Sequence, residues 1–353
     1  MGGLIRVGIV GADADRGWAR RAHVPAIAAT DGVALTAVCN RHLERAEAAR
    51  DAFGAARAYT SPLDLASSDD VDLVVVAVKV PEHAEVVDAA QAAGKQIYCE
   101  WPLGRTAGEA RTLCAGARPD DVVGLQARAA PAVRFVRDLV RRGEIGEVLS
   151  TSLIASARGW GAATDERLAY TEDARNGASM LSIAFGHGVD AVCWTLGEFA
   201  ELSATLATRR REIPVDGAAA TVERTVHDQV AVTGVLAGGA VASIHYRGGR
   251  SSGTNFLWEL NGTDGDVVVT APSGQLQMTS PTVRVGRGSE LVDVTPPSSS
   301  GESANVAEAY RLLSLGGEGL ATFADAVVRH ELLARVEERA ASSQSISAKE
   351  LHA

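Results

Sequence analysis

The sequence predicts a two-domain protein, with an N-terminal α/β domain built on a doubly wound parallel sheet and a C-terminal α+β domain built on a large open, mostly antiparallel sheet. Up to about residue 125, short apolar runs alternate with alanine-rich stretches of helical spacing, as expected for buried parallel strands joined by crossover helices. After about residue 147, longer alternating runs are joined by Gly and Asp turns. With 353 residues, 46% hydrophobic and 22% charged, the chain is long enough for two cores.

The first domain is predicted to span residues 1–126. Its expected strands are five apolar runs, at 5–10, 34–39, 73–78, 96–99 and 122–125. The stretch EHAEVVDAAQAAGK follows the third run and has the apolar spacing of a helix that packs on the sheet. Strands and helices in this order predict right-handed crossovers and a parallel sheet.

The second domain is predicted to span residues 127–353. An amphipathic helix from about 131 to 142 ends at Gly143 and leads into the second sheet. The strands are expected in EVLSTSLIASA, HDQVAVTGVLAGGAVASIHYR and NFLWELNGTDGDVVVTA, with one helical run, SMLSIAFGHGVDAVCWTL, between them. A C-terminal helix over about 303–341, broken at a Gly-Gly pair, precedes a tail that is expected to fray.

The alternating strands also predict self-association. Their apolar residues exceed what one layer of helices covers, so we expect an open apolar sheet face that binds a second copy, giving a homodimer or homotetramer. The residues expected on that face are Val230, Val232, Ile244, Phe256 and Leu260.

Composition excludes several partner classes. Lys and Arg total 34 against 44 Asp and Glu, a formal net charge of -10 without a long basic tract, so no nucleic-acid partner is expected. The longest apolar run, LVVVAV, is too short to span a bilayer, so we expect a cytoplasmic protein without a membrane partner. The four cysteines are far apart in the sequence, which predicts buried reduced thiols. Cys and His residues do not cluster in the sequence, so we expect no metal site.

The segment VGIVGADADRGWARRAHVPAI, residues 7–27, contains the first functional signal. A strand that enters Gly11, followed by Gly17 before a helix, suits a βα turn whose helix N-terminus faces a pyrophosphate. Asp13 stands where a second glycine is usual, and its carboxylate would repel phosphate unless the side chain turns away to cap the following helix. A tight turn of any α/β protein is the alternative.

Together with VDLVVVAVKVPEHAEVVDAAQAAGKQIYCEWPLGRT, this segment resembles the Gfo/Idh/MocA oxidoreductase family, which includes glucose-fructose oxidoreductase and inositol dehydrogenase. GWARRAHVPAI, EWPL, QAR and FGHGVDAV look most like the branch that contains the galactose-regulon repressor, which senses rather than catalyses. The resemblance covers nearly the whole chain. It implies a Rossmann domain that binds a nicotinamide dinucleotide, NAD(P), and a sugar, cyclitol or related polyol bound between the nicotinamide and the second domain.

The resemblance also implies catalytic positions, two of which are altered. Family members move a hydride between the cofactor and a hydroxyl-bearing carbon, with a lysine that polarises the oxygen and an Asp and a His that assist proton transfer. Here Glu100 matches the family glutamate, and Trp101 replaces the lysine that follows it. His187 and Asp190 match, whereas Ile183 takes the earlier acidic position.

Three residues are therefore catalytic candidates. His187 titrates in a useful range, and Asp190, three residues further along the helix, can support its imidazole from the same face. Lys79 replaces the proline of the family's A-T-P turn and is placed beside the nicotinamide ribose, where it can supply the charge lost at Trp101. The alternatives are a core histidine and a solvent-facing lysine.

The residues implied for cofactor binding are Gly11, Asp13, Gly17, Trp18, Asn40, Arg41, Val78, Lys79, His83, Glu100 and Trp101. Those implied for the substrate are Trp101, Arg128, Trp160, Tyr170, Asn176 and His187. An indole offers a flat apolar wall to a sugar, and Arg128 can bind hydroxyls or a carboxylate. For Trp101 the alternative is a core position, for Arg128 a domain-joining salt bridge, and for the loop aromatics a hydrophobic plug.

The strand VALTAVC ends in Asn40 and Arg41, where an NAD-preferring site usually has an Asp or Glu that accepts from the ribose hydroxyls. Arg41 and Arg45 can pair with a 2'-phosphate, so we expect NADP to be slightly favoured over NAD. The prediction is an NAD(P)-dependent oxidoreductase for a sugar, cyclitol or glycoside. The alternatives are a non-catalytic sensor that regulates a partner protein and an enzyme that recycles a permanently bound cofactor.

Overall fold

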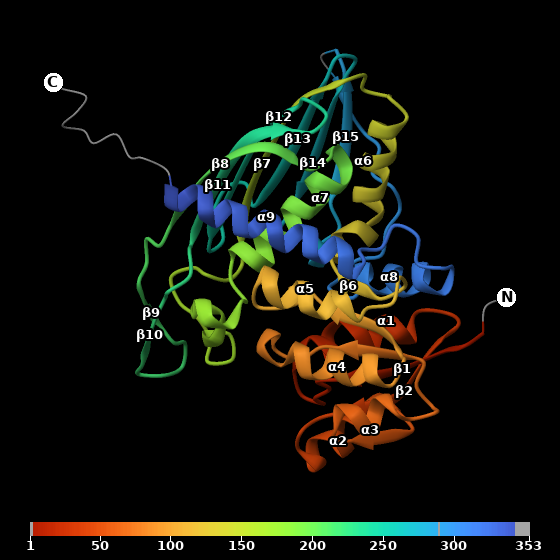
Figure 1. Cartoon of the computed structure of the whole chain (residues 1–353). Coiled ribbons are helices and arrows are strands. Elements are labelled where there is room, and N and C mark those ends of the chain that lie inside the picture. Colours follow the sequence, from red (N-terminus) through yellow and green to blue (C-terminus); the bar gives the residue numbers. More distant parts are fainter. Residues whose placement is uncertain (1–2, 289, 343–353) are drawn as a thin grey trace.

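The computed structural model describes residues 3–288 and 290–342 (Figure 1). It confirms the predicted architecture: the parallel sheet with its helices forms the lower part of Figure 1, and the second sheet stands above it. Among the described helices, none is both long and apolar enough to cross a membrane.

The first sheet is parallel, with the strand order β3-β2-β1-β4-β5-β6. Its strands are β1 Ile5–Val10, β2 Val33–Cys39, β3 Arg57–Tyr59, β4 Leu73–Val76, β5 Gln96–Glu100 and β6 Val122–Gly124. Every residue of β4 is buried, as expected for a strand covered on both faces. The order reverses between β1 and β4, and in such sheets a ligand crevice forms at that point, outside the carboxyl ends of the strands.

Helices cover both faces of this sheet. They are a π-helical turn at Ala19–His23 that continues into α1 Val24–Ala28, then α2 Leu43–Phe53, α3 Pro62–Ala66, α4 His83–Ala92 and α5 Ala107–Ala115. Strand β3 is absent from the sequence prediction because the three residues Arg-Ala-Tyr form no apolar run.

The second sheet has eight strands in the order β16-β15-β14-β13-β7-β12-β11-β8. Only one neighbouring pair, β7 and β12, is parallel; the others are antiparallel. The strands are β7 Val148–Ala157, β8 Phe199–Ala207, β11 Gln229–Leu236, β12 Val241–Gly248, β13 Phe256–Gly262, β14 Asp266–Ala271, β15 Thr282–Arg287 and β16 Glu290–Asp293. A separate hairpin pairs β9 Glu212–Pro214 with β10 Thr221–Glu223.

Helices α6 Pro131–Arg141, α7 Gly186–Leu196 and α9 Phe323–Ser342 pack beside this sheet (Figure 1). Helix α8, Ala304–Ser314, instead returns to the first domain, where Tyr310 belongs to the same buried cluster as Val7 and Ile9. The C-terminal segment therefore ties the two domains together. The expected tail beyond residue 342 lies outside the described residues.

The residues expected on the open sheet face do not lie there. Val230, Val232, Ile244, Phe256 and Leu260 are all 0–1% exposed, because they belong to the core of their own chain. The alternation of apolar and polar residues shows that a strand has an apolar side. It does not show whether helices of the same chain or a second copy cover that side.

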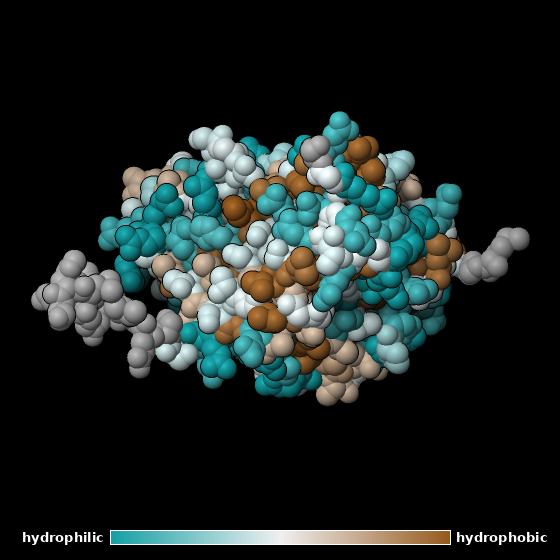
Figure 2. Space-filling view, turned by 90° about the horizontal axis from the view of Figure 1, so that it is seen from above, coloured by the Kyte–Doolittle hydropathy of each residue, from teal (hydrophilic) through white to brown (hydrophobic). Residues whose placement is uncertain are grey.

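The opposite face of the sheet has a mixed character. It carries exposed apolar residues such as Ile154 and Val241 beside serines and threonines. On the surface of the whole molecule seen from above, apolar residues likewise lie in small groups among hydrophilic ones (Figure 2). The homodimer or homotetramer stays a prediction, but the five residues expected at its interface cannot form it.

Candidate functional site

A cleft of about 920 Å³ lies at the carboxyl ends of β1, β2 and β4. Eight of the residues predicted for the cofactor line it: Gly11, Asp13, Gly17, Trp18, Asn40, Arg41, Val78 and Lys79. The turn after β1 requires glycine at its start, because Gly11 has φ 97° and a Cβ there would lie 2.5 Å from the carbonyl oxygen of Ala77. Gly17 has φ 90°, and nothing lies within 4 Å of a Cβ built on it.

Asp13 lines the cleft, and its carboxylate is bound to neighbouring groups of the turn. Its Oδ1 accepts a hydrogen bond of 3.0 Å from the backbone N–H of Asp15. Its Oδ2 lies 3.4 Å from both Arg16 Nε and Arg45 Nη1. The carboxylate thus caps the loop before the π-helical turn, and two guanidinium groups offset its charge.

The end of β2 joins this turn. Asn40 Nδ2 donates to the carbonyl oxygen of Ala12 at 2.7 Å, and Arg41 Nη2 lies 2.7 Å from Glu82 Oε1. Two features fit the cleft to an anionic dinucleotide. The buried indole N–H of Trp18 has no partner among the described residues, so it is available to a ligand. The charged lining is seven basic residues, Arg16, Arg20, Arg21, Arg41, Arg45, Lys79 and Arg167, against five acidic ones, Asp13, Asp15, Glu82, Glu85 and Asp165.

The second domain also contributes to the cleft. Asp165, Arg167, Leu168 and Tyr170 line it, and Lys79 Nζ lies 4.6 Å from the centre of the Tyr170 ring. Lys79 is exposed, so the structure places it at the mouth of the cleft. Sequence analysis identified only Tyr170 of these loop residues. The charged run TDER at 164–167 of the same insertion could have indicated Asp165 and Arg167, whereas no sequence signal marks Leu168.

Trp101 is not an open wall for a sugar. It is 5% exposed, its indole N–H donates to the carbonyl oxygen of Ser182 at 2.6 Å, and its ring centre lies 4.6 Å from that of His330. It is absent from the described lining of the cleft. The indole therefore packs the junction between the domains, which was the alternative to a substrate contact.

His83 and Glu100 lie beside the cleft rather than in it. The ring nitrogens of His83 lie 3.3 Å and 3.2 Å from the carbonyl oxygens of Leu103 and Val78, and burial lowers the pKa of this imidazole. His83 thus braces the turn after β4 instead of facing a ligand.

Glu100 belongs to a polar network that crosses the domains. Its Oε1 lies 2.9 Å from His23 Nε2, and the amide of Gln126 donates to both carboxylate oxygens at 2.9 and 2.8 Å. His23 Nδ1 in turn lies 2.7 Å from the hydroxyl of Tyr310 on α8. These contacts fix the carboxylate at the end of β5.

His187 is the catalytic candidate that the geometry supports best. It is 3% exposed at the start of α7, and its Nδ1 has no hydrogen-bond partner among the described residues. Burial lowers its pKa to about 4, while the negative charges of Glu100 and Asp190 oppose that shift. A buried ring nitrogen without a protein partner is a natural position for a ligand atom. At neutral pH the ring is uncharged and can accept a proton.

Asp190 supports the imidazole of His187 through its negative charge, while its hydrogen bonds go to two arginines. Its two oxygens accept hydrogen bonds of 2.8 Å each from Arg128 and one of 3.2 Å from Arg329. Arg128 also lies 3.1 Å from Asp325, and Arg329 donates to Glu198. The substrate role expected for Arg128 is therefore replaced by the domain-joining salt bridge, because its side chain is 6% exposed and its guanidinium pairs with Asp190 and Asp325.

Two loop residues that were predicted to contact the substrate instead form hydrogen bonds within their own loop. Trp160 is 6% exposed and donates its indole N–H to the carbonyl oxygen of Thr171 at 3.1 Å. Asn176 Nδ2 donates to the carbonyl oxygen of Tyr170 at 2.7 Å. Neither is among the described residues that line the cleft.

The buried histidines predict an acid-sensitive fold. Burial lowers the pKa of His187 and of His330 to about 4, against about 6.5 in an unfolded chain. Between these values the unfolded state binds more protons, so stability is complete above pH 6.5 and is lost as the pH falls toward 4, by roughly 3 kcal/mol per histidine. Carboxylates such as Asp190, whose pKa is lowered by Arg128 and Arg329, lose their contribution only below the ordinary carboxyl range.

Urea unfolding at pH 7 and at pH 4.5 tests this expectation. The free energy of unfolding should be several kcal/mol smaller at pH 4.5. His330→Leu should make the profile less steep, since it removes one of the histidines whose pKa is lowered by burial. A wild-type profile that stays level down to pH 4.5 would show that these imidazoles are not shifted as described.

Comparison with known proteins agrees with this geometry. Residues 5–127 match the family described as "Oxidoreductase family, NAD-binding Rossmann fold", and residues 131–271 match "Gal80p, C-terminal domain". Dehydrogenase aclE of Aspergillus oryzae is 32% identical over 374 residues, which cover 98% of this chain and 99% of that protein. The galactose/lactose metabolism regulatory protein GAL80 of Saccharomyces cerevisiae is 26% identical over 76% of this chain and 67% of its own.

Solved structures show the same fold. A super-repressor mutant of Gal80p from Saccharomyces cerevisiae superposes with a TM-score of 0.88 at 22% identity, covering 97% of both chains. Levoglucosan dehydrogenase in complex with NADH and levoglucosan gives 0.81 at 24% identity, covering 96% of this chain and 97% of the other. Because a dehydrogenase matches along the whole sequence and both domains match their families, the chain belongs to the Gfo/Idh/MocA oxidoreductase family, in the branch near Gal80p.

Proposed function

We propose that this protein is an active NAD(P)-dependent oxidoreductase that transfers a hydride between the nicotinamide and a CH–OH carbon of a sugar, cyclitol or glycoside. The observation that carries the proposal is that His187 has a buried imidazole whose Nδ1 has no hydrogen-bond partner among the described residues. The negative charge of Glu100 raises the pKa of this ring, against the effect of burial. The full-length similarity to a dehydrogenase supports it. Hydride transfer from an alcohol needs a group that takes the hydroxyl proton, and His187 meets that need.

The glycine turn and the ends of β2 and β4 would hold the dinucleotide, with Gly11, Gly17, Asn40, Val78 and Lys79 as its neighbours. When bound, the nicotinamide accepts or supplies the hydride. Lys79 contributes a positive charge at the mouth of the cleft.

His187 would accept the hydroxyl proton on its unpartnered Nδ1 during oxidation and return it during reduction. The charge of Glu100 raises the pKa of the ring and so stabilises the imidazolium that forms. Burial acts in the opposite direction and keeps the ring neutral between turnovers. The substrate hydroxyl would thus be the missing hydrogen-bond partner of this nitrogen.

A second candidate function is a non-catalytic sensor that binds the cofactor or a sugar and regulates a partner protein. It is favoured by Trp101, which replaces the family lysine and fills its surroundings with a packed indole. The similarity to the regulatory protein GAL80 supports it as well. An enzyme that recycles a retained cofactor between two substrates is a variant of the first proposal.

One assay separates enzyme from sensor. Purified protein is mixed with NAD+ or NADP+ and a panel of sugars, cyclitols and glycosides, and the absorbance of the reduced cofactor is followed. The proposal expects turnover on at least one alcohol of the panel. Tight binding of the cofactor without reduction by any member would favour the sensor.

We further propose that the cleft accepts NADP and slightly favours it, since β2 is followed by Asn40 and Arg41 rather than by an acid. Arg41 now pairs with Glu82, and this exposed pair is weak enough for a 2'-phosphate to replace it. Arg41→Ala should weaken NADP binding by roughly 10-fold and NAD binding much less, because one charge-assisted contact is lost.

Calorimetric titration of both cofactors measures these effects. Arg57→Ala is the control, because Arg57 is an exposed arginine of the same domain that pairs with Asp70 outside the cleft. Detectable NAD binding with no detectable NADP binding in the wild type would contradict the preference.

A further inference from the structure

A segment of the second domain lies along the cofactor cleft. Residues 158–180 run between β7 and α7, and Asp165, Arg167, Leu168 and Tyr170 from this segment line the cleft. The segment has little regular structure, apart from 3-10 turns at Ala169–Glu172 and Ala174–Asn176 and a π-helical turn that begins at 181. Its shape must therefore come from side-chain contacts.

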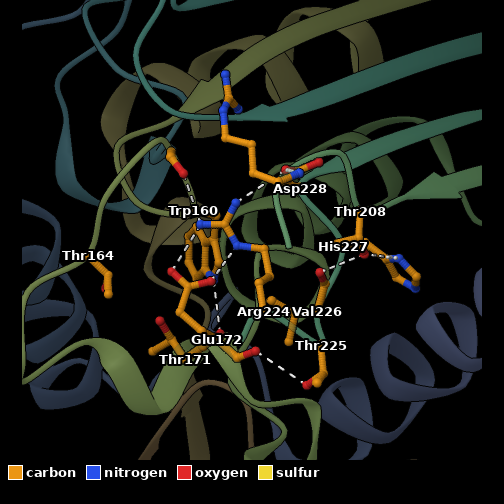
Figure 3. Close-up of polar contacts among 12 residues, drawn as sticks. Trp160, Thr164, Thr171, Glu172, Thr208, Arg224, Thr225, Val226, His227 and Asp228 are labelled. Carbon is orange, nitrogen blue, oxygen red and sulfur yellow. Dashed lines mark hydrogen bonds and ion pairs between the residues drawn. The ribbon is translucent and has the colours of Figure 1, made fainter. Parts of the chain in front are cut away.

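The strongest of these contacts is a buried ion cluster around Arg224 (Figure 3). Arg224 Nε donates to Glu172 Oε2 at 2.6 Å, and Nη2 lies 3.2 Å from Glu172 Oε1. Nη2 also donates to the carbonyl oxygen of Gly161 at 3.0 Å, and Nη1 lies 3.2 Å from Asp228 Oδ2. One guanidinium thus binds the segment at two points, Gly161 and Glu172, and joins both to the end of the sheet.

The cluster is anchored on the sheet side by Asp228. Its two carboxylate oxygens accept hydrogen bonds of 2.9 Å each from the backbone N–H groups of Arg209 and Arg210, just after the end of β8. Asp228 itself immediately precedes β11, which begins at Gln229. The side chains of Arg224, Glu172 and Asp228 are 0%, 2% and 0% exposed. Two carboxylates share one guanidinium, and the backbone donors satisfy the remaining oxygens. Removing one member would leave buried charge uncompensated.

Backbone contacts next to the cluster add to the anchoring. Thr225 N–H donates to the carbonyl oxygen of Glu172 at 2.9 Å, and Ala174 N–H donates to Thr225 Oγ1 at 2.9 Å. Thr164 forms an isolated bridge with Val215, beside the β9–β10 hairpin. Trp160, in a left-handed conformation with φ 55°, closes the segment on itself through its bond to Thr171. All these contacts belong to the second domain, so the segment is fixed to that domain.

On its other side the segment faces the first domain. Tyr170 lies two residues before Glu172, lines the cleft, and has Lys79 Nζ 4.6 Å from its ring centre. The position of Glu172 therefore sets the position of the ring that meets Lys79 across the cleft. Tyr170 is half-buried and Lys79 is exposed, so the ring is the more fixed partner and the lysine the more adaptable one.

We propose that Arg224, Glu172 and Asp228 are positioning residues that fix the segment 158–180 along the cleft and so slow the release of the cofactor. This inference rests on the proposed cofactor-dependent function. A segment held by a buried ion cluster opens rarely, so a dinucleotide beneath it leaves slowly. Arg224, Glu172 and Asp228 are not among the described residues that line the cleft.

The test measures cofactor release. Glu172→Gln keeps the shape of the side chain but removes the charge that Arg224 binds, and Arg224→Lys keeps a cation but loses the forked contact. The dissociation rate of NADPH, followed by stopped-flow fluorescence, should rise at least about 10-fold in both variants, a change of about 1.4 kcal/mol. The KM for the cofactor should rise with it, while kcat should not fall by more than about 2-fold, because faster release of the cofactor cannot slow the chemical step.

Two further variants keep the test decisive. Tyr170→Leu removes the aromatic ring whose position the cluster sets, without disturbing a buried charge. It should reproduce the faster release even if a cluster variant fails to fold. Trp258→Phe is the stability control, since this buried β13 residue donates to Thr151 Oγ1 at 2.9 Å far from the segment in sequence. It should lower the melting temperature without changing the release rate.

The outcomes separate the two proposals. If the wild type binds neither NAD nor NADP, the proposed function fails before the cluster is tested. If the wild type binds the cofactor but folded Glu172→Gln and Arg224→Lys release it at the wild-type rate, the positioning role is refuted, whatever the result for Tyr170→Leu. If Trp258→Phe accelerates release as much as Glu172→Gln, general loosening of the domain explains the effect and the role is likewise refuted.

Discussion

Replacing His187 with alanine is expected to lower kcat by about 100-fold to 10,000-fold while the dissociation constant of the cofactor changes little. The variant loses the buried ring nitrogen that has no protein partner, and with it the group proposed to accept the hydroxyl proton. The residues that line the dinucleotide cleft are untouched, because His187 is not among them. Steady-state rates on the alcohol found in the panel, with calorimetric titration of the cofactor, measure both quantities.

Lys79→Met is the informative companion variant. Lys79 lines the cleft and can supply the positive charge that the family lysine provides elsewhere. If His187 is the main proton-transfer group, Lys79→Met should lose less activity than His187→Ala. A loss as large as that of His187→Ala would show that the lysine function has moved to Lys79. Normal turnover by His187→Ala would contradict the role given to the imidazole.

The second large effect is expected for stability. Asp190→Asn should lower the free energy of unfolding by about 3–5 kcal/mol, because Arg128 and Arg329 would be left buried without their shared carboxylate. Arg128 and Arg329 are 5% and 1% exposed, so water cannot replace the lost charge. Urea unfolding at pH 7 gives the difference from wild type.

Asp72→Asn provides the comparison. It breaks the pair between Arg6 and Asp72, whose side chains are 38% and 41% exposed, and should cost no more than about 1 kcal/mol. If Asp190→Asn were as stable as Asp72→Asn while turnover collapsed, Asp190 would be a catalytic residue and its assignment to the interdomain network would be wrong.

The sequence predicts the first domain well because its signals are local. Five apolar runs became β1, β2, β4, β5 and β6, and the glycine turn occupies the expected place at Gly11. Each signal is a property of a few consecutive residues: burial on both faces of a strand, or a backbone conformation that requires glycine. The short strand β3 has neither property.

The partners of polar side chains are not local, and there the predictions fail. The indole of Trp101 donates to Ser182, 81 residues away, and Arg128 pairs with Asp190, 62 residues away. The chemical type of Arg128 is compatible with a substrate contact and with an ion pair alike. Only the placement of Asp190 on the facing helix α7 decides between them.

Long-range packing also decides which face of a sheet is covered. The alternation in β11 and β12 predicts that Val230 and Ile244 share a side of the sheet, and they do, with both buried. Whether helices of the same chain or a second copy cover that side depends on where α6, α7 and α9 return to the sheet. No short stretch of sequence contains that information.

Deuterium transfer tests the central claim of an active oxidoreductase most directly. The protein is incubated with NAD(P)+ and panel alcohols that carry deuterium on the carbinol carbon, and the nicotinamide product is analysed by mass spectrometry. The account predicts reduced cofactor that contains one deuterium, formed by the wild type and strongly diminished in His187→Ala. Cofactor that binds in the cleft and is recovered oxidised and unlabelled with every alcohol would contradict it.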